Sequence, residues 1–199
     1  MAENTAQAGA DLCTNCGLCC TGLIFPRVGV KPTDEFVYLH PDVELKVTGP
    51  GKKSMALPCQ FLKDMLCSIY TDRPRNCRAY TCDLNQCVVN GADEYDNALA
   101  VIQNLNRLID EIDPVLVELT GEDFRAIGFQ EFCKSFAGDA SQRLFEGEAL
   151  TAIEQKFIPL AFDIIKTADR FLRKTKRLAE FANLMVAKDQ WNGREESRS

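Results

Sequence analysis

The sequence has one histidine and no long apolar run, and each scarcity removes a class of function. Because His40 is the single histidine among 199 residues, catalysis by a Ser-His-Asp or Cys-His-Asp set has little support. No segment reaches the ~18 consecutive apolar residues that a membrane-spanning helix needs, so we expect no membrane association. The sequence presents no other catalytic set, and whether the protein is an enzyme stays open.

Basic residues are also fewer than acidic residues. The net charge is -6 at pH 7, and the excess acid lies in residues 91–199, because residues 1–90 carry equal numbers of basic and acidic side chains. A general nucleic-acid binder needs a positive surface, so nucleic acid is not an expected partner. The first ten residues lack the basic and apolar regions of a secretory signal. We therefore expect a cytoplasmic protein, in which thiols stay reduced.

Cysteine, in contrast, is abundant and clustered. Of the ten cysteines, all but Cys133 lie before residue 90. Residues 13–20 read Cys-Thr-Asn-Cys-Gly-Leu-Cys-Cys, and a Cys-x2-Cys-x2-Cys spacing lets the sulfurs converge on one point, as in iron–sulfur and zinc sites. Reduced thiols at this density predict metal ligands, with disulfides as the alternative. The predicted ligands are Cys13, Cys16, Cys19, Cys20, Cys59, Cys67, Cys77 and Cys82.

The spacing alone fits iron and zinc equally well. A four-iron cluster needs four thiolates and leaves spare thiols, whereas eight thiolates suffice for two closed four-coordinate zinc sites. Because neighbouring side chains usually point apart, Cys19 and Cys20 are expected to serve different centres, or one of them none. His40 could replace a cysteine at zinc, but we expect it not to be a ligand. We favour an iron–sulfur cluster of the 4Fe-4S type, with Zn²⁺ as the alternative.

Arginine and aromatic residues surround the second group of cysteines. Either kind of site carries about two negative charges, and the cations nearest in sequence are Arg73, Arg75 and Arg78. We predict that they balance this charge, with ordinary solvated arginines as the alternative. Phe61, Tyr70 and Tyr80 are expected to form a small core, or else an apolar collar around the metal.

These residues also match a known pattern. The order Cys-x2-Cys-Gly-x-Cys-Cys, Pro-Cys-x-Phe-Leu, Cys-x-Ile-Tyr and Arg-Pro-x2-Cys-Arg-x-Tyr-x-Cys resembles the YkgJ-type cysteine-cluster proteins. That family is described as having a zinc- or iron-chelating domain, and a related cluster occurs in flagellin lysine N-methylases of the FliB type. The resemblance covers roughly residues 13–82 and implies metal binding by the same eight cysteines. Cys87 and Cys133 fall outside the pattern.

The chain changes character at Asn90-Gly91. Before it, turn-forming residues separate short apolar pieces, so we expect brief strands or turns and no long helices. Pro74 is expected to start a short helix that carries Cys77. Beyond Gly91, apolar residues recur at helical spacing in several stripes. Asp113-Pro114 is interpreted as a helix start, Pro159 as a kink, and Cys133 as a small buried apolar residue.

The expected fold is therefore mostly α. We predict a loop-rich, metal-stapled cysteine-cluster domain over residues 11–90, an α-helical bundle domain over residues 91–190 and a disordered tail over residues 191–199. For function, a redox, sensing or modification-supporting role of an iron–sulfur cluster is the first hypothesis. The alternatives are a structural zinc module that recruits a protein partner through its helical region, and a metal-delivery factor. A basic run at Arg170, Arg173, Lys174, Lys176 and Arg177 is interpreted as a solvated helix face.

Overall fold

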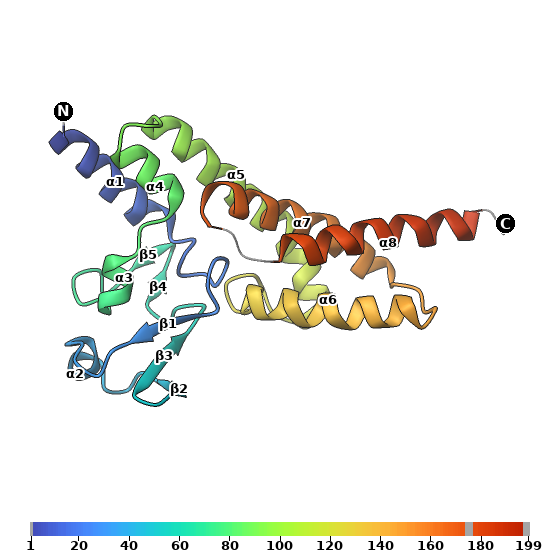
Figure 1. Ribbon diagram of the computed structural model, residues 1–199, viewed down its shortest axis with the longest axis horizontal. Helices are drawn as coiled ribbons and strands as arrows, with labels where there is room; N and C mark the ends of the chain where they lie inside the picture. The colour runs from blue at the N-terminus through green and yellow to red at the C-terminus, as the bar shows by residue number, and fades with distance from the viewer. Residues whose placement is uncertain (1, 174–176, 197–199) are drawn as a thin grey trace. The chain divides into compact units, whose positions relative to one another are not determined.

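The computed structural model describes residues 2–173 and 177–196. The chain forms two compact units, Met1–Ile102 and Gln103–Ser199, and is mostly helical with small sheets in the first unit, as predicted (Figure 1). The division falls within a helix at residues 102 and 103, further along the chain than the Asn90-Gly91 turn. The domain bounds expected from composition, 11–90 and 91–190, stay predictions.

The first unit contains a three-stranded antiparallel sheet. Its strands are β1 (Arg27–Val30), β2 (Lys46–Gly49) and β3 (Lys52–Ala56), in the order β1-β3-β2. Val28 pairs with Met55, and Val30 with Lys53. Buried Val30, Phe36 and Met55 form a small core, against which the partly buried Cys59 and Phe61 pack. The sheet thereby fixes the segment that carries Cys59.

A second, smaller hairpin carries Cys67. Its strands are β4 (Leu62–Lys63) and β5 (Leu66–Cys67). Asp64 and Met65 at its turn have φ of 48° and 62°, the left-handed pair that a tight two-residue hairpin turn needs. The segment Phe36–Leu39, for which a strand or turn was expected, forms the short helix α2 instead.

Three further helices complete the first unit up to residue 89. They are α1 (Ala2–Cys16), α3 (Arg75–Ala79) and α4 (Asp83–Val89). The start of α3 directly after Pro74 confirms the prediction for that proline. The expectation of no long helix before residue 90 is wrong, because α1 has 15 residues. It packs on α4, where the Asn85 side chain donates to the Gly9 carbonyl at 2.6 Å.

Helix α5 (Tyr95–Thr120) corrects the interpretation of Asp113-Pro114 as a helix start, because the helix continues through Pro114. Ile112 and Leu116 on either side are fully buried, so their packing outweighs the hydrogen bond that the proline cannot make. The Asp113 carboxylate accepts the Phe124 N–H at 2.8 Å. It therefore secures the following turn and does not cap α5. Thr120 ends the helix before Gly121, as expected.

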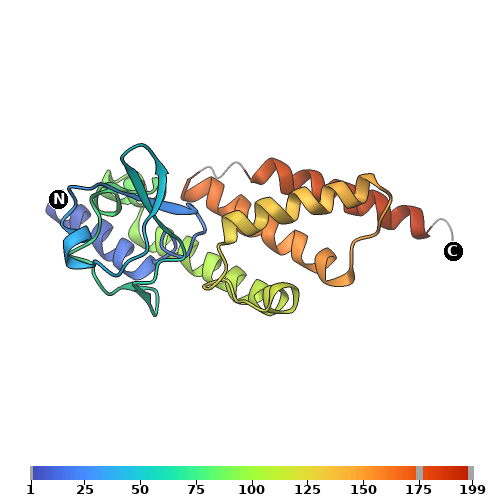
Figure 2. The same cartoon turned by 90° about the horizontal axis from the view of Figure 1, so that it is seen from below.

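The second unit contains three more long helices, which lie alongside one another (Figure 2). They are α6 (Phe129–Phe145), α7 (Ala152–Phe171) and α8 (Leu178–Glu196). Pro159 lies inside α7 as predicted. In the sequence, one apolar stripe predicts a last helix that includes Ala168, Phe171, Leu172, Leu178, Phe181 and Met185. The structure assigns Ala168 and Phe171 to α7 and begins α8 at Leu178. Helix α8 extends into the predicted tail as far as Glu196, whereas residues 197–199, and Lys174 and Lys176 of the basic run, lie outside the described residues.

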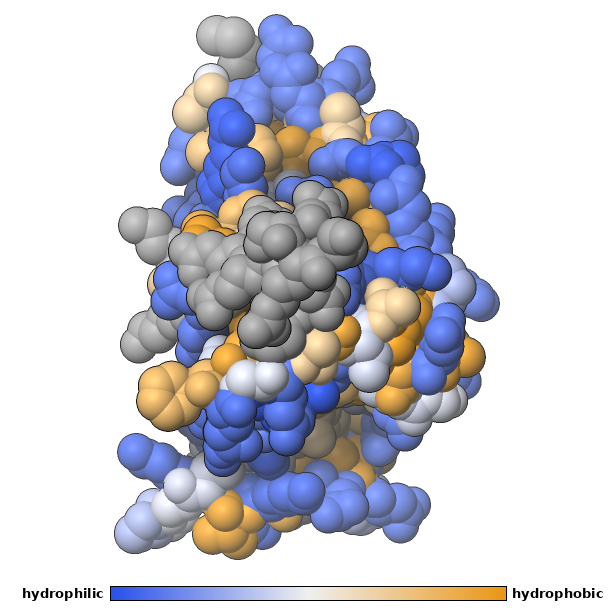
Figure 3. Space-filling model, turned by 90° about the vertical axis from the view of Figure 1, so that its right-hand side faces the viewer, coloured by the Kyte–Doolittle hydropathy of each residue, from blue (hydrophilic) through white to orange (hydrophobic). Residues whose placement is uncertain are grey.

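Phenylalanine rings form the core of the second unit. Phe136, Phe157 and Phe181 from α6, α7 and α8 meet with ring centroids 4.7 to 6.3 Å apart. Cys133 is fully buried, which confirms its prediction as a small core residue. The face drawn in Figure 3 carries mostly hydrophilic residues with apolar areas between them. Within the described residues, no helix has the length and apolar character needed to cross a bilayer.

Candidate metal centre

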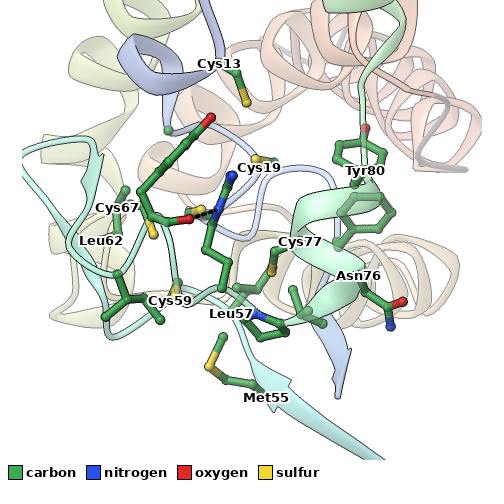
Figure 4. Close-up of a pocket in the computed structure, with 18 of the residues that line it drawn as sticks. Cys13, Cys19, Met55, Leu57, Cys59, Leu62, Cys67, Asn76, Cys77 and Tyr80 are labelled. Carbon is green, nitrogen blue, oxygen red and sulfur yellow. Dashed lines mark hydrogen bonds between the residues drawn. The ribbon is translucent and has the colours of Figure 1, made fainter. Parts of the chain in front are cut away.

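Six of the predicted cysteine ligands line one cavity of about 270 Å³ in the first unit. Figure 4 shows the side chains of Cys19, Cys59, Cys67 and Cys77 around a common space, with Cys13 reaching toward it from α1. The remaining wall is mostly apolar. It includes Phe25, Val28, Met55, Leu57, Leu62, Met65, Ile69 and Pro74. Cys16 and Cys82 are not among the lining residues.

Backbone contacts bring the two cysteine segments together. Helix α1 ends at Cys16, and Gly17 follows at φ 62°, so the chain turns sharply between two ligands. A Cβ atom at Gly17 would lie 2.5 Å from the Met65 carbonyl oxygen, which leaves room only for glycine. The Cys20 N–H donates to the Gly17 carbonyl at 2.8 Å, and the Cys59 N–H donates to the Cys20 carbonyl at 2.8 Å.

The electrostatic neighbours of the eight thiols form two groups that overlap, chiefly at Cys19. The pKa of Cys16 is raised to about 12, mainly by burial, with smaller contributions from the neighbouring thiols of Cys19, Cys82 and Cys13. Burial likewise raises the pKa of Cys77 to about 12, with contributions from the thiols of Cys59, Cys19 and Cys67. We define the upper set as Cys13, Cys16, Cys19 and Cys82, and the lower set as Cys20, Cys59, Cys67 and Cys77.

Cys19 and Cys20 meet where the two sets adjoin. A hydrogen bond from the Cys20 thiol lowers the pKa of Cys19 despite its burial, and the same bond raises the pKa of Cys20. All ten cysteines are free thiols in this structure. In the described part of the chain, no three histidine, cysteine or carboxylate side chains are already arranged around one ion. For either set to bind a metal, its cysteine side chains must therefore rotate and its thiols must lose their protons.

Of the three predicted cations, the structure brings Arg73 to the cavity. Its guanidinium lies 3.5 Å from the centre of the Tyr70 ring and donates through Nε to the Tyr70 carbonyl at 2.7 Å. Its charge lowers the pKa of Cys19, after the larger effects of hydrogen bonding and burial. Arg75 lies 3.8 Å from Asp34, and Arg78 donates to the Thr71 carbonyl at 3.4 Å; neither lines the cavity.

The aromatic residues and His40 divide between two places. Tyr70 and Tyr80 line the cavity, whereas Phe61 packs in the small core. His40 contacts Phe36 and Phe61, with ring centroids 5.2 and 4.9 Å away, and is not part of the cavity wall. Phe61 therefore follows the expectation of a small core, whereas Tyr70 and Tyr80 lie where the alternative, an apolar collar, places them.

Sequence reasoning missed the apolar wall. Met55 comes from β3 and Met65 from a hairpin turn, so no local motif connects them with the cysteines. Phe25 contacts Tyr80 edge-on at 4.9 Å, again across a long stretch of chain. Cys87, outside the predicted ligand set, is exposed on α4 and lies apart from the cavity wall.

The donor set suits a thiolate-bound metal. Sulfur ligands select zinc, copper(I) and iron–sulfur clusters over hard cations. The cavity combines cysteine sulfurs from four segments with two arginines, Arg27 and Arg73. No curated protein and no solved structure matches the chain. Residues 12–98 match the model of the CxxCxxCC family, described as a "putative zinc- or iron-chelating domain", which confirms the YkgJ-type resemblance over this part of the chain.

Proposed function

We propose that the first unit carries an iron–sulfur cluster on its lower set of cysteines and that the protein uses it in a redox, sensing or modification-supporting role. The observation that carries the proposal is the cavity itself. All four thiols of the lower set line a space of about 270 Å³, whereas a mononuclear zinc site encloses one ion with sulfurs about 2.3 Å away. A cluster of several iron and sulfide atoms uses such a space.

The surroundings of the lower set support the same proposal. Apolar side chains such as Leu57 and Met55 limit the access of water, and a cluster's potential depends on solvent exposure and nearby hydrogen bonds. Arg73 supplies a positive charge against the net negative charge of a four-thiolate cluster. The upper set then holds a second metal or serves as reserve thiols. The cytoplasmic location and a protein partner for the helical unit stay predictions.

A specific observation favours a second candidate, a structural zinc module. The eight thiols fall into two sets of four, and two closed zinc sites with four cysteine ligands each need that number. Closed zinc sites only stabilise the fold, because they leave no open coordination position. In that case both sets hold zinc and the protein is colourless.

Cysteine variants of the full chain, purified without oxygen, separate these candidates. We expect Cys59→Ser to remove iron and the absorption near ~400 nm of thiolate-bound iron. Cys16→Ser, in the upper set, should keep most of that absorption. Cys87→Ser is the matched control, because Cys87 is exposed and outside both sets. Zinc without iron in the unmodified protein and in Cys87→Ser, with part of the zinc lost in both Cys59→Ser and Cys16→Ser, would rule out the iron–sulfur proposal and leave the zinc module.

A further inference from the structure

A second hollow adjoins the cysteine cavity and has a different chemical character. It has a volume of about 550 Å³ and is formed by α1, α3, α4 and the segment around Tyr70. It shares Cys13, Tyr70, Arg73, Cys77 and Tyr80 with the cavity. The rest of its wall mixes polar residues with Gly9, Ala10 and Val89, so its lining is more polar than that of the cysteine cavity.

Both permanently charged side chains in the wall of this hollow are positive. They are Arg73 and Arg78, and no aspartate or glutamate is among the described residues that line it. Within the described part of the chain, neither arginine has a carboxylate partner. In a protein with a net charge of -6, two adjacent cations without an acidic partner indicate a site for an external anion.

Both guanidinium groups are held in place by one short segment. Arg73 donates to the Tyr70 carbonyl and stacks on its ring, and Arg78 donates to the Thr71 carbonyl. A guanidinium has five N–H donors, so each arginine uses only part of its capacity in these contacts. Positioned guanidinium groups bind carboxylate and phosphate through paired hydrogen bonds.

Side-chain amides on α4 are held beside the arginines. The Asn85 amide donates to the Gly9 carbonyl at 2.6 Å, and the Gln86 amide donates to the Thr81 carbonyl at 3.1 Å. Both residues line the hollow. These hydrogen bonds position the two amides before a ligand arrives, which lowers the entropy lost on binding.

We propose that this hollow binds a small molecule through a carboxylate or phosphate group, next to the cysteine cavity. The proposal goes beyond metal binding and does not depend on which metal is present. Arg73 borders both sites, so thiolate–metal charge and the anion both attract it. Arg78 borders only the hollow and is the residue that distinguishes anion binding from metal binding.

Titration calorimetry of the full chain with its metal, at constant ionic strength, tests the proposal with inorganic phosphate and acetate as probes. We expect saturable binding of at least one, weakened roughly tenfold or more in Arg78→Gln because a charged hydrogen bond is lost. Binding of phosphate alone identifies a phosphate ligand, and binding of acetate alone identifies a carboxylate.

The matched control is Arg75→Gln, which removes the same charge from α3 at a residue outside the hollow. Its anion affinity should equal that of the unmodified protein. Equal weakening in both variants, or no saturable binding of either probe, overturns the proposal. Metal analysis of the same samples keeps this result separate from the iron–sulfur proposal, since Arg78→Gln should retain its full metal content.

Discussion

At the residue scale, a glycine controls the geometry of the cysteine turn. Gly17 lies between two predicted ligands at a positive φ, with the Met65 carbonyl directly against it. A side chain there meets two penalties, one from the backbone conformation and one from the close contact. The glycine of the Cys-Gly-x-Cys pattern is thus explained by the backbone conformation at this turn, and not only by the spacing of the cysteines.

We predict that Gly17→Ala lowers both stability and metal content. The left-handed backbone alone costs roughly 1–2 kcal/mol, and the 2.5 Å approach to a carbonyl oxygen adds to it. Gly51→Ala is the matched control, because Gly51 has φ 65° and open space around its Cβ position. Denaturant unfolding and metal analysis of both variants measure the difference. Equal losses in the two would contradict the role of the Met65 contact.

Arg73 is the second residue with an effect on the centre. Burial raises the pKa of the Cys13 and Cys77 thiols, and the positive charge of Arg73 offsets part of that rise. In Arg73→Gln those pKa values rise, so protons compete better with the metal and loading shifts to higher pH. Zinc titrations across a pH series, with Arg75→Gln for comparison, measure this shift. Identical pH profiles for the two variants would refute it.

At the element scale, apolar periodicity predicted most of the helical unit but misplaced several helix ends. The stripe around Ala168 and Phe181 gave no sign of the break that separates α7 from α8, because both helices contribute to one core. Pro114 suggested a helix start, yet buried neighbours keep α5 continuous. The sequence pattern did not predict helix α1, because this segment is rich in alanine and has few large apolar residues at helical spacing. Its packing on α4 depends on residues that are distant in the sequence.

The sequence predicted the cysteines of the candidate centre but few of the other residues that line its cavity. Cysteine spacing identified six thiols that the fold gathers at one cavity. Proximity in sequence suggested three arginines, of which only Arg73 lines that cavity. Arg73 precedes α3, whereas Arg75 and Arg78 lie on that helix and contact Asp34 and the Thr71 carbonyl. The apolar wall and the arginine hollow come from segments that are distant in sequence, and single-sequence patterns carry no such information.

The start of α7 provides a prediction at the same scale. Thr151 and Glu154 form a capping box, and Arg143 of α6 pairs with Glu154. Burial raises the pKa of Glu154, but hydrogen bonds from Arg143 and Thr151 outweigh it and hold the pKa below its usual value. This stabilisation is present above the pKa of an unfolded glutamate and is lost as pH falls through the lower folded value.

Glu154→Gln should therefore destabilise the protein at neutral pH by about 1–2 kcal/mol, and the difference from the unmodified protein should shrink in acid. Glu111→Gln is the control, because Glu111 forms an exposed pair with Arg107 on α5 and should cost under about 0.5 kcal/mol. Thermal denaturation at several pH values measures both. A Glu154→Gln deficit that grows in acid would contradict the assigned direction.

At the scale of the whole molecule, the two units differ in what stabilises them. The second unit has a core of phenylalanine rings from three helices. The first unit joins short strands and helices around eight thiols, which come from segments between residues 13 and 82. Metal binding to such a set adds directly to folding free energy. We therefore predict that the stability of the first unit depends on metal and that the stability of the second unit does not.

Removal of metal by a chelator should accordingly affect the units unequally. We expect amide hydrogen exchange to accelerate in the sheet and in α3 and α4, while α6 and α7 keep their protection. Exchange measured by mass spectrometry on metal-loaded and chelator-treated protein resolves the two regions. Equal acceleration throughout would show that the units unfold together.

The central claim is that the cysteine cavity holds an iron–sulfur cluster. Its most direct test is the content of iron, acid-labile sulfide and zinc in protein purified without oxygen. Our account predicts iron and sulfide in comparable amounts, bound to a brown protein. Stoichiometric zinc in a colourless protein without iron or sulfide would contradict it.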